Sequence, residues 1–208
     1  MNVVVFGAAG RIGRHVVKRA LGHGHAVRVF THRSTLEVRH ERLTTVAGDV
    51  LDSDAVGSAV RGCDAVAFAL SQGSAAGAGV HEAGIANVIH AMASNDVARL
   101  AAVSAAGTFA RGDRHLSLAY RALVATTMRL VYDDLEAMEM RITASGLDWA
   151  IVRPVGLTDE PASGHYRISL DGCLLPKPKR ISREDVAALV VKALETDTYV
   201  RRAVVIAR

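Results

Sequence analysis

Apolar and polar positions alternate with different periods along the chain, and each change of period predicts a new element. Val3 to Phe6 is a continuous apolar run rich in valine, which is typical of a strand buried on both faces of a parallel sheet. From Ile12 to Leu21 the apolar residues recur at helical spacing. The chain therefore opens with a predicted strand, a turn and a helix.

The same alternation continues along the rest of the chain. Further strands are predicted at 26–31, 43–47, 64–70, 97–103, 147–153 and 203–207, with a short extra strand at 165–170. Helices are predicted around 53–60, at 80–94, from about 114 to 145, and after Ser182, where Ser182 and Asp185 form a variant capping box. The long helix has an apolar stripe made of Val124, Met128, Val131, Leu135, Met138 and Ile142.

This order of elements predicts the fold class. Strands that alternate with helices indicate an α/β fold, here a Rossmann-type doubly wound parallel sheet with helices on both faces. The length of 208 residues favours one domain, 1–208. Within it, residues 154–181 are expected to form a small C-terminal excursion on the substrate side.

Composition narrows the class of protein. A hydrophobic content of 50% argues against disorder, and two cysteines are too few for a disulfide framework. No apolar run reaches the roughly 18 residues of a membrane span, and the N-terminus is a core strand rather than a signal peptide. We therefore expect a cytoplasmic protein, monomeric or a small homo-oligomer, that binds a small molecule.

Charge does not point to a nucleic-acid partner. The net charge is +4, the basic residues are scattered, and aromatic residues make up only 4% of the chain. His23 and His25 lie in the turn after the first helix, and we interpret them as solvent-exposed turn residues rather than metal ligands. No metal site is predicted.

The strand–turn–helix at the N-terminus contains Gly7-x-x-Gly10-x-x-Gly13, the context of a dinucleotide-binding loop. Gly7 permits the tight turn, Gly10 lets a pyrophosphate approach the backbone, and Gly13 lets the helix pack close to the strand. The helix N-terminus supplies free N–H groups and a positive dipole end. The alternative is a purely structural turn.

The second strand ends where such folds bind the adenosine ribose. No Asp or Glu lies between Phe30 and Leu36, and Arg33 is followed by the hydroxyl residues Ser34 and Thr35. A guanidinium at this place suits the 2′-phosphate of NADP, whereas an acidic residue would suit NAD. The alternative is a surface arginine on a loop. Asp49, after the third strand, either accepts a hydrogen bond from adenine or caps the next turn.

Two further strand ends contain candidate residues. Ser71–Gly79 is a run of small residues, either a flexible linker or a flap over the cofactor. Ser104 follows the fifth strand, where it can hydrogen-bond the nicotinamide carboxamide or the hydride acceptor, or only turn the chain. Ser104 is the candidate catalytic residue.

Several motifs together resemble the atypical short-chain dehydrogenase/reductase superfamily, in its NmrA-like branch. They are the glycine loop, Gly48-Asp49-Val50, Gly84-x-x-Asn87-Val88, Ser145–Trp149 leading to Arg153-Pro154, and Ile181–Ala187. Within that branch the chain is most similar to the biliverdin IXβ reductase/flavin reductase family, on the Asp133-Asp134 pair and the tract Asp159–Gly172. The resemblance implies an NADPH-dependent oxidoreductase that passes hydride to a flat conjugated acceptor such as a flavin, a bilin or a quinone.

The resemblance also implies roles for individual residues. Arg11 and Ile12 would meet the pyrophosphate with the glycine loop, and His32 or Arg33, beside Ser34, would meet the 2′-phosphate. The remaining contacts would run from adenine through the ribose to the nicotinamide, and would be made by Asp49 and Val50, Leu70 and Ser71, Val103 and Ser104, and Pro154 and Val155.

The sequence departs from the family in two places. Ser104-Ala105 stands where a Thr-Ser pair is expected, so only the first hydroxyl remains, and Gly156 stands where a histidine is expected. Both departures affect residues expected to face the hydride acceptor rather than residues expected to bind the cofactor.

The general superfamily dyad Tyr-x-x-x-Lys is absent as well. Tyr132 is followed by Glu136, and Tyr120 by Val124. A carboxylate works against ionisation of a nearby phenol, so carbonyl–alcohol chemistry is not expected. Hydride transfer to a conjugated ring depends more on stacking and orientation. The alternatives are an NmrA-like redox sensor that binds NADP without turnover, which the missing dyad favours, and an isomerase or epimerase, which it disfavours.

Overall fold

The computed structural model describes residues 1–32, 36, 38–70, 79–108 and 128–208. Within these ranges one sheet has the strand order β3-β2-β1-β4-β5-β6-β10-β8. Its strands are β1 (Asn2–Phe6), β2 (Ala26–Thr31), β3 (Leu43–Ala47), β4 (Ala65–Phe68), β5 (Arg99–Val103), β6 (Asp148–Pro154), β8 (Arg167–Ser169) and β10 (Arg202–Ala207). All neighbours in it are parallel except β8, which pairs antiparallel with β10.

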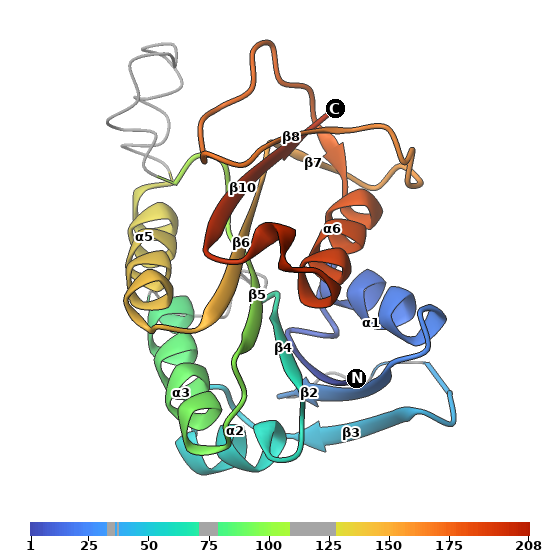
Figure 1. Ribbon diagram of the computed structural model, residues 1–208, viewed down its shortest axis with the longest axis vertical. Coiled ribbons are helices and arrows are strands. Elements are labelled where there is room, and N and C mark those ends of the chain that lie inside the picture. The colour runs from blue at the N-terminus through green and yellow to red at the C-terminus, as the bar shows by residue number, and fades with distance from the viewer. Residues whose placement is uncertain (33–35, 37, 71–78, 109–127) are drawn as a thin grey trace.

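Helices cover both faces of this sheet (Figure 1). On one face lie α1 (Gly13–Gly22) and α6 (Arg183–Glu195), which pack on the odd-numbered valines of β1. On the other lie α2 (Ser53–Val60), α3 (Val80–Ser94) and α5 (Arg129–Ala144), packed on Val4 and Phe6. Because both faces of the central strands β1 and β4 are buried, Val3 to Phe6 and Ala65 to Phe68 are apolar without interruption. The predicted Rossmann-type doubly wound fold is confirmed, and the predicted bounds of β2, β3 and α3 are reproduced.

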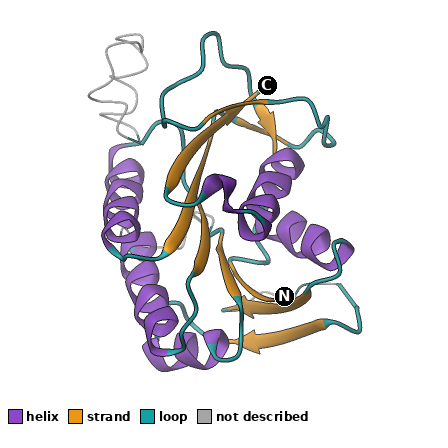
Figure 2. Ribbon diagram, viewed as in Figure 1, coloured by secondary structure: helices purple, strands orange, loops and turns teal. Residues whose placement is uncertain are grey.

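The excursion 154–181 contains little regular structure, as the loops between β6 and α6 in Figure 2 show. Its regular parts are β8 and the strand β7 (Leu157–Thr158), which pairs in parallel with β9 (Ile181–Ser182). β8 lies within the extra strand predicted at 165–170. It pairs antiparallel with β10 and is the edge strand on that side of the sheet. The one-turn helix η2 (Asp197–Tyr199) joins α6 to β10.

The long helix predicted from about 114 to 145 is wrong as a continuous element. The described helix α5 begins at Arg129, and Met128 before it has non-helical dihedrals of φ −111° and ψ 11°. Met128 is also 37% exposed, so it does not continue the core stripe. Leu135, Met138 and Ile142 are buried as predicted, while Val124 lies outside the described residues.

The turn after α1 is a Schellman motif, in which glycine takes the left-handed position. Gly24 has φ +88°, the N–H of His25 donates to the Ala20 carbonyl, and the N–H of Gly24 donates to the Leu21 carbonyl. His23 and His25 lie in this turn as predicted, but the His25 side chain is only 12% exposed. The interpretation of both as solvent-exposed residues is therefore wrong for His25.

The two cysteines lie in different environments: Cys63 is buried after α2, whereas Cys173 is exposed on the excursion. Burial raises the pKa of the Cys63 thiol, and the neighbouring Arg28 charge offsets this in part. Cys173 lines an open hollow of about 510 Å³ formed by residues 169–171 and 173–176, none of which is a predicted cofactor residue. Within the described ranges, no helix combines the length and apolar character that a membrane span requires.

Candidate nucleotide-binding site

The glycine loop has the close backbone contacts that its spacing predicts. Gly7 has φ +76°, and a Cβ there would lie 2.4 Å from the Ala69 carbonyl oxygen, at the end of the neighbouring strand β4. A Cβ on Gly13 would lie 2.1 Å from the Gly7 carbonyl oxygen. Neither position has room for a side chain, since the obstructing atoms are backbone atoms. The loop is thus a backbone cradle at the sheet's switch point, where α/β folds bind ligands.

The N-terminus of α1 opens onto this cradle. Ile12 occupies the N-cap position, and no side chain accepts a hydrogen bond there. Gly10 is held by its N–H to the Gly7 carbonyl at 2.9 Å, and its carbonyl accepts the N–H of Arg14 at 3.1 Å. A helix start without a capping side chain leaves N–H groups and the positive dipole end for an anion. The cradle therefore fits a pyrophosphate.

Arg11 pairs with a carboxylate in the structure. Its guanidinium bonds Asp159 of the excursion, and the other oxygen of Asp159 accepts from Arg183 Nη1 at 2.8 Å. Partial desolvation raises the pKa of Asp159, but the charges of Arg11 and Arg183 outweigh it and hold that pKa below its ordinary value. The assignment of Arg11 to the pyrophosphate stays a prediction, and it requires this exposed ion pair to exchange partners.

At the adenosine end, His32 and Asp49 follow adjacent strands, with His32 Nε2 3.7 Å from Asp49 Oδ2. Asp49 Oδ1 also accepts the Leu51 N–H at 3.0 Å, so it caps the next turn while keeping an exposed oxygen. Val50 is buried, and Asn87 Nδ2 donates to its carbonyl at 3.0 Å. Arg33, Ser34 and the flap residues from Ser71 to Ala78 lie outside the described residues.

A buried His–Asp pair lies beside Leu70, a predicted ribose contact, and the sequence analysis did not find it. Asp134 of α5 accepts from His81 Nδ1 at 2.8 Å and from the backbone N–H groups of His81 and Glu82 at 3.1 and 2.9 Å. His81 Nε2 lies 3.4 Å from the carbonyl of Leu70. Asp134 thus caps α3 from another helix and positions the segment after β4. The sequence analysis used the Asp133-Asp134 pair only as a mark of family resemblance. The pair by itself did not reveal that Asp134 caps α3.

At the predicted nicotinamide end, Ser104 forms a hydroxyl pair that the sequence did not reveal. Val103 and Ser104 end β5 beside Pro154 of β6: the Ser104 N–H donates to the Val152 carbonyl, and the Ala106 N–H to the Pro154 carbonyl. The hydroxyl of Ser104 lies 3.1 Å from that of Thr108, and both residues are buried. A second hydroxyl therefore stands near Ser104 despite Ala105. Val155 follows, its N–H donating to the Ile206 carbonyl.

Tyr132 lies directly against this segment. A Cβ on Gly107 would lie 2.5 Å from the phenol oxygen and ring of Tyr132. Tyr132 is buried, and it shares its helix with Glu136 one turn later. The phenol therefore packs on the loop after β5, and the sequence provides no lysine at the dyad position beside it.

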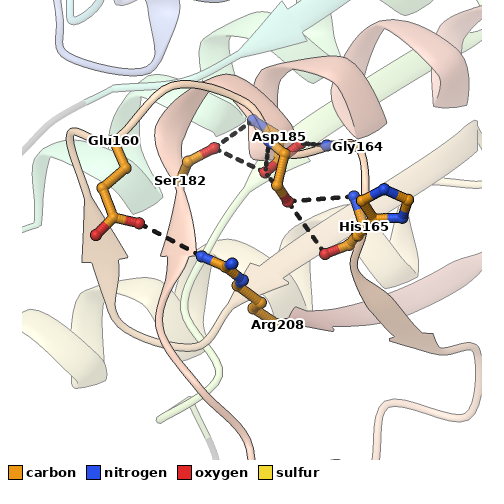
Figure 3. A network of polar contacts seen from close by, with 7 residues as sticks. Glu160, Gly164, His165, Ser182, Asp185 and Arg208 are labelled. Carbon is orange, nitrogen blue, oxygen red and sulfur yellow. Dashed lines mark hydrogen bonds and ion pairs between the residues drawn. The ribbon is translucent and has the colours of Figure 1, made fainter.

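The excursion is anchored by the first turn of α6 (Figure 3). Ser182 Oγ accepts the Asp185 N–H at 3.0 Å, as the predicted capping box requires. Asp185, however, does not complete the box: its carboxylate accepts the backbone N–H groups of Ser163 and Gly164 at 3.0 Å each, and the Ser182 hydroxyl at 2.9 Å. Burial raises the pKa of Asp185, but these hydrogen bonds outweigh it and hold the pKa below its ordinary value.

A buried ion pair lies next to Pro154, a predicted nicotinamide contact. Glu139 of α5 is 1% exposed, and Arg153 Nε of β6 lies 3.1 Å from each of its carboxylate oxygens, with Nη2 bonded to one of them as well. A Cβ on Gly172 would lie 3.1 Å from Arg153 Nη1. The pair therefore joins α5, β6 and the excursion.

Comparison with known proteins gives the family of the chain. A family profile described as NAD(P)H-binding matches residues 7–197. Over 211 residues the chain is 26% identical to an uncharacterized sugar epimerase, YhfK, of Bacillus subtilis strain 168, a match that covers 98% of this chain and 92% of that protein.

Two solved structures show the same fold. A short-chain dehydrogenase/reductase of Veillonella parvula in complex with NADP has a TM-score of 0.83 at 17% identity, covering 100% of this chain and 94% of that one. ChuY of Escherichia coli O157:H7, described as an anaerobillin reductase, has a TM-score of 0.77 at 20% identity, covering 100% and 97%. The predicted resemblance to short-chain dehydrogenase/reductase proteins is confirmed in fold, and the profile match over most of the chain gives its family. The chain belongs to the NAD(P)H-binding family.

Proposed function

We propose that the protein is an NADPH-dependent reductase that transfers hydride to a flat conjugated acceptor of the flavin, bilin or quinone type. The observation that carries the proposal is the backbone cradle at Gly7 and Gly13, whose Cβ positions are closed by backbone atoms at 2.4 and 2.1 Å, facing a helix start without a side-chain cap. When bound, NADPH supplies the hydride. The chain's own residues bind and orient the partners.

The choice of NADPH depends on the end of β2. Arg33 and Ser34 provide a guanidinium and a hydroxyl for the 2′-phosphate, and the sequence has no acidic residue there to favour NAD. His32 is exposed at the same strand end. The Veillonella structure with the same fold contains NADP, which supports this choice.

The choice of acceptor depends on the nicotinamide end. Ser104 and Thr108 offer hydroxyls that can orient a carboxamide or an acceptor oxygen, while Tyr132 has Glu136 and no lysine at the dyad position. A ketone needs a tuned acid to receive hydride, whereas a conjugated ring needs mainly stacking and position. The same missing dyad argues against sugar epimerisation. A neighbour in fold, ChuY, is described as a reductase.

The test is NADPH oxidation by the pure protein with FMN, FAD, biliverdin and quinones, each compared with NADH. We expect oxidation with at least one acceptor and a preference for NADPH. Arg33→Ala should raise the KM for NADPH about 10- to 150-fold, because a lost charge-assisted phosphate contact costs about 1.5–3 kcal/mol. Arg202→Ala, which removes an equal charge from an exposed position on β10, is the matched control.

A second candidate is a redox sensor that binds NADP without turnover. The missing dyad and the burial of the Ser104 hydroxyl favour it. Tight NADPH binding by calorimetry with no oxidation across the whole panel would select the sensor over the reductase. A preference for NADH, or an unchanged KM in Arg33→Ala, would refute the phosphate assignment.

A further inference from the structure

Two histidines and a glutamate converge at the end of the molecule away from the nucleotide cradle. His23 Nδ1 and His25 Nε2, from the turn after α1, each lie 2.8 Å from Glu195 Oε1, at the end of α6. One ligand atom from each of the three residues lies within 4.8 Å of the others. Two imidazoles and a carboxylate are the ligand set of known three-ligand zinc sites.

The backbone fixes the two histidines before any ion binds. They are the C-cap and C″ residues of the Schellman motif, on either side of Gly24. The reversal at Gly24 turns both rings toward α6, and Arg42 Nη1 holds the Gly24 carbonyl at 2.8 Å. The histidines therefore project from a rigid turn, which lowers the entropic cost of gathering ligands.

Two negative helix ends and a carboxylate at this corner attract a cation, against the charges of Arg19 and Arg42 nearby. The C-termini of α1 and α6 meet here, and each is the negative end of a helix dipole. Glu195 adds a full negative charge to the last residue of α6, an unfavourable place for an acid unless a positive charge accompanies it. Lys192, one turn earlier, lies 6.0 Å over the ring of Tyr199.

We propose that His23, His25 and Glu195 form a binding site for a zinc-type divalent transition-metal ion, with water completing the shell. Tetrahedral coordination needs neighbouring ligand atoms about 3.3 Å apart, since metal–ligand distances are about 2.0–2.2 Å. The two 2.8 Å separations must therefore open by a few tenths of an ångström, and the histidine nitrogens must present lone pairs in place of N–H groups.

The ion would have a structural role. The 10 residues of α1 separate this corner from the glycine loop, a distance of about 15 Å at 1.5 Å per residue. A bound ion would join the end of α1 to the end of α6, the two helices that share one face of the sheet (Figure 1). It would stabilise the fold without touching the cofactor or acceptor, so this inference is independent of the proposed function.

The test is calorimetric titration of Zn²⁺ into chelator-treated full-length protein that contains Cys173→Ser, which removes the exposed thiol as a competing ligand. We expect a binding step with one ion per chain, weakened about tenfold or more by His23→Ala and by Glu195→Gln. His90→Ala, which removes an exposed histidine from α3, should leave this step unchanged. Mg²⁺, which prefers oxygen ligands, should give no comparable step.

A second readout covers the possibility that a variant loses its fold. Co²⁺ added to the Cys173→Ser protein should produce visible absorption bands that Zn²⁺ abolishes, and circular dichroism should confirm that Glu195→Gln is folded. The absence of a Zn²⁺ step in the Cys173→Ser protein, or a step that survives in both folded variants, would overturn the proposal. In that case the three residues form only a hydrogen-bonded helix clamp.

Discussion

The two halves of the candidate site are built by opposite means. The centre of the nucleotide side, the glycine loop after β1, depends on side chains that are absent: Gly7 and Gly13 leave backbone atoms in direct contact. The acceptor side, at the ends of β5 and β6 and in the excursion, depends on charges that are present. There Glu139 pairs with Arg153, and Asp185 holds Ser163 and Gly164.

This difference predicts what each half can tolerate. A backbone cradle is sensitive to added volume and nearly indifferent to pH, because its donors do not titrate. A region held by buried carboxylates is sensitive to the loss of a charge or a proton. The exposed ion pair between Arg11 and Asp159 joins the two halves, because Arg11 belongs to the glycine loop and Asp159 to the excursion.

The largest effect is expected on the acceptor side from Glu139→Ala. Removing one partner of a buried ion pair costs about 3–5 kcal/mol, because the attraction between the two charges in a low dielectric is lost. The free energy of unfolding, measured in urea, should fall by this amount. The control is Glu82→Gln, which breaks the exposed pair with Arg141 and should cost about 0–1 kcal/mol. Similar losses in both variants would break the comparison.

A smaller effect is expected on the nucleotide side from Gly7→Ala. The added methyl group meets the Ala69 carbonyl at 2.4 Å, at a φ that L residues rarely adopt. Overpacking and strain of this kind cost about 1–3 kcal/mol, and the cradle should lose measurable NADPH binding by calorimetry. Gly57→Ala, in α2 with open space around it, should instead stabilise by about 0.5–1 kcal/mol. Normal binding by Gly7→Ala would contradict the cradle.

The smallest effect, a change in pH dependence, sharpens the comparison. Because the pKa of Asp185 is lower in the folded state than its ordinary value, the ionised carboxylate stabilises the fold at neutral pH. This contribution to stability is lost as the pH falls from the ordinary pKa of a carboxyl group through the lower pKa that Asp185 has in the folded state. Asp185→Asn should therefore be less stable at pH 7, with a flatter decline into acid. The exposed control Asp54→Asn should keep the wild-type slope in thermal melts from pH 7 to pH 3.

Most of the fold could be predicted because its signals are local. Strand periodicity, the capping Ser182 and the spacing of Gly7 and Gly13 each act within a few residues. The prediction failed at Met128, where the periodic apolar pattern continues although the backbone dihedrals are not helical. Periodicity records which residues can share a face, but it does not record where a helix begins.

The site was less predictable because its contacts join distant segments. Arg11 meets Asp159 across 148 positions, and His23 meets Glu195 across 172. Such pairs depend on how α1 packs against α6 and the excursion, which no local spacing encodes. Thr108, only four positions after Ser104, was missed for a different reason: the loop after β5 has no regular period that would predict its hydroxyl beside that of Ser104.

The contrast between the two thiols gives the protein a chemical handle. Cys173 is exposed on the excursion, while Cys63 is buried and its pKa is raised, so a maleimide dye should modify Cys173 alone in the native state. A fluorophore at that position would report on the hollow formed by residues 169–171 and 173–176 without any engineered cysteine. Movement of the acceptor side on addition of nucleotide could then be followed directly in the wild-type chain.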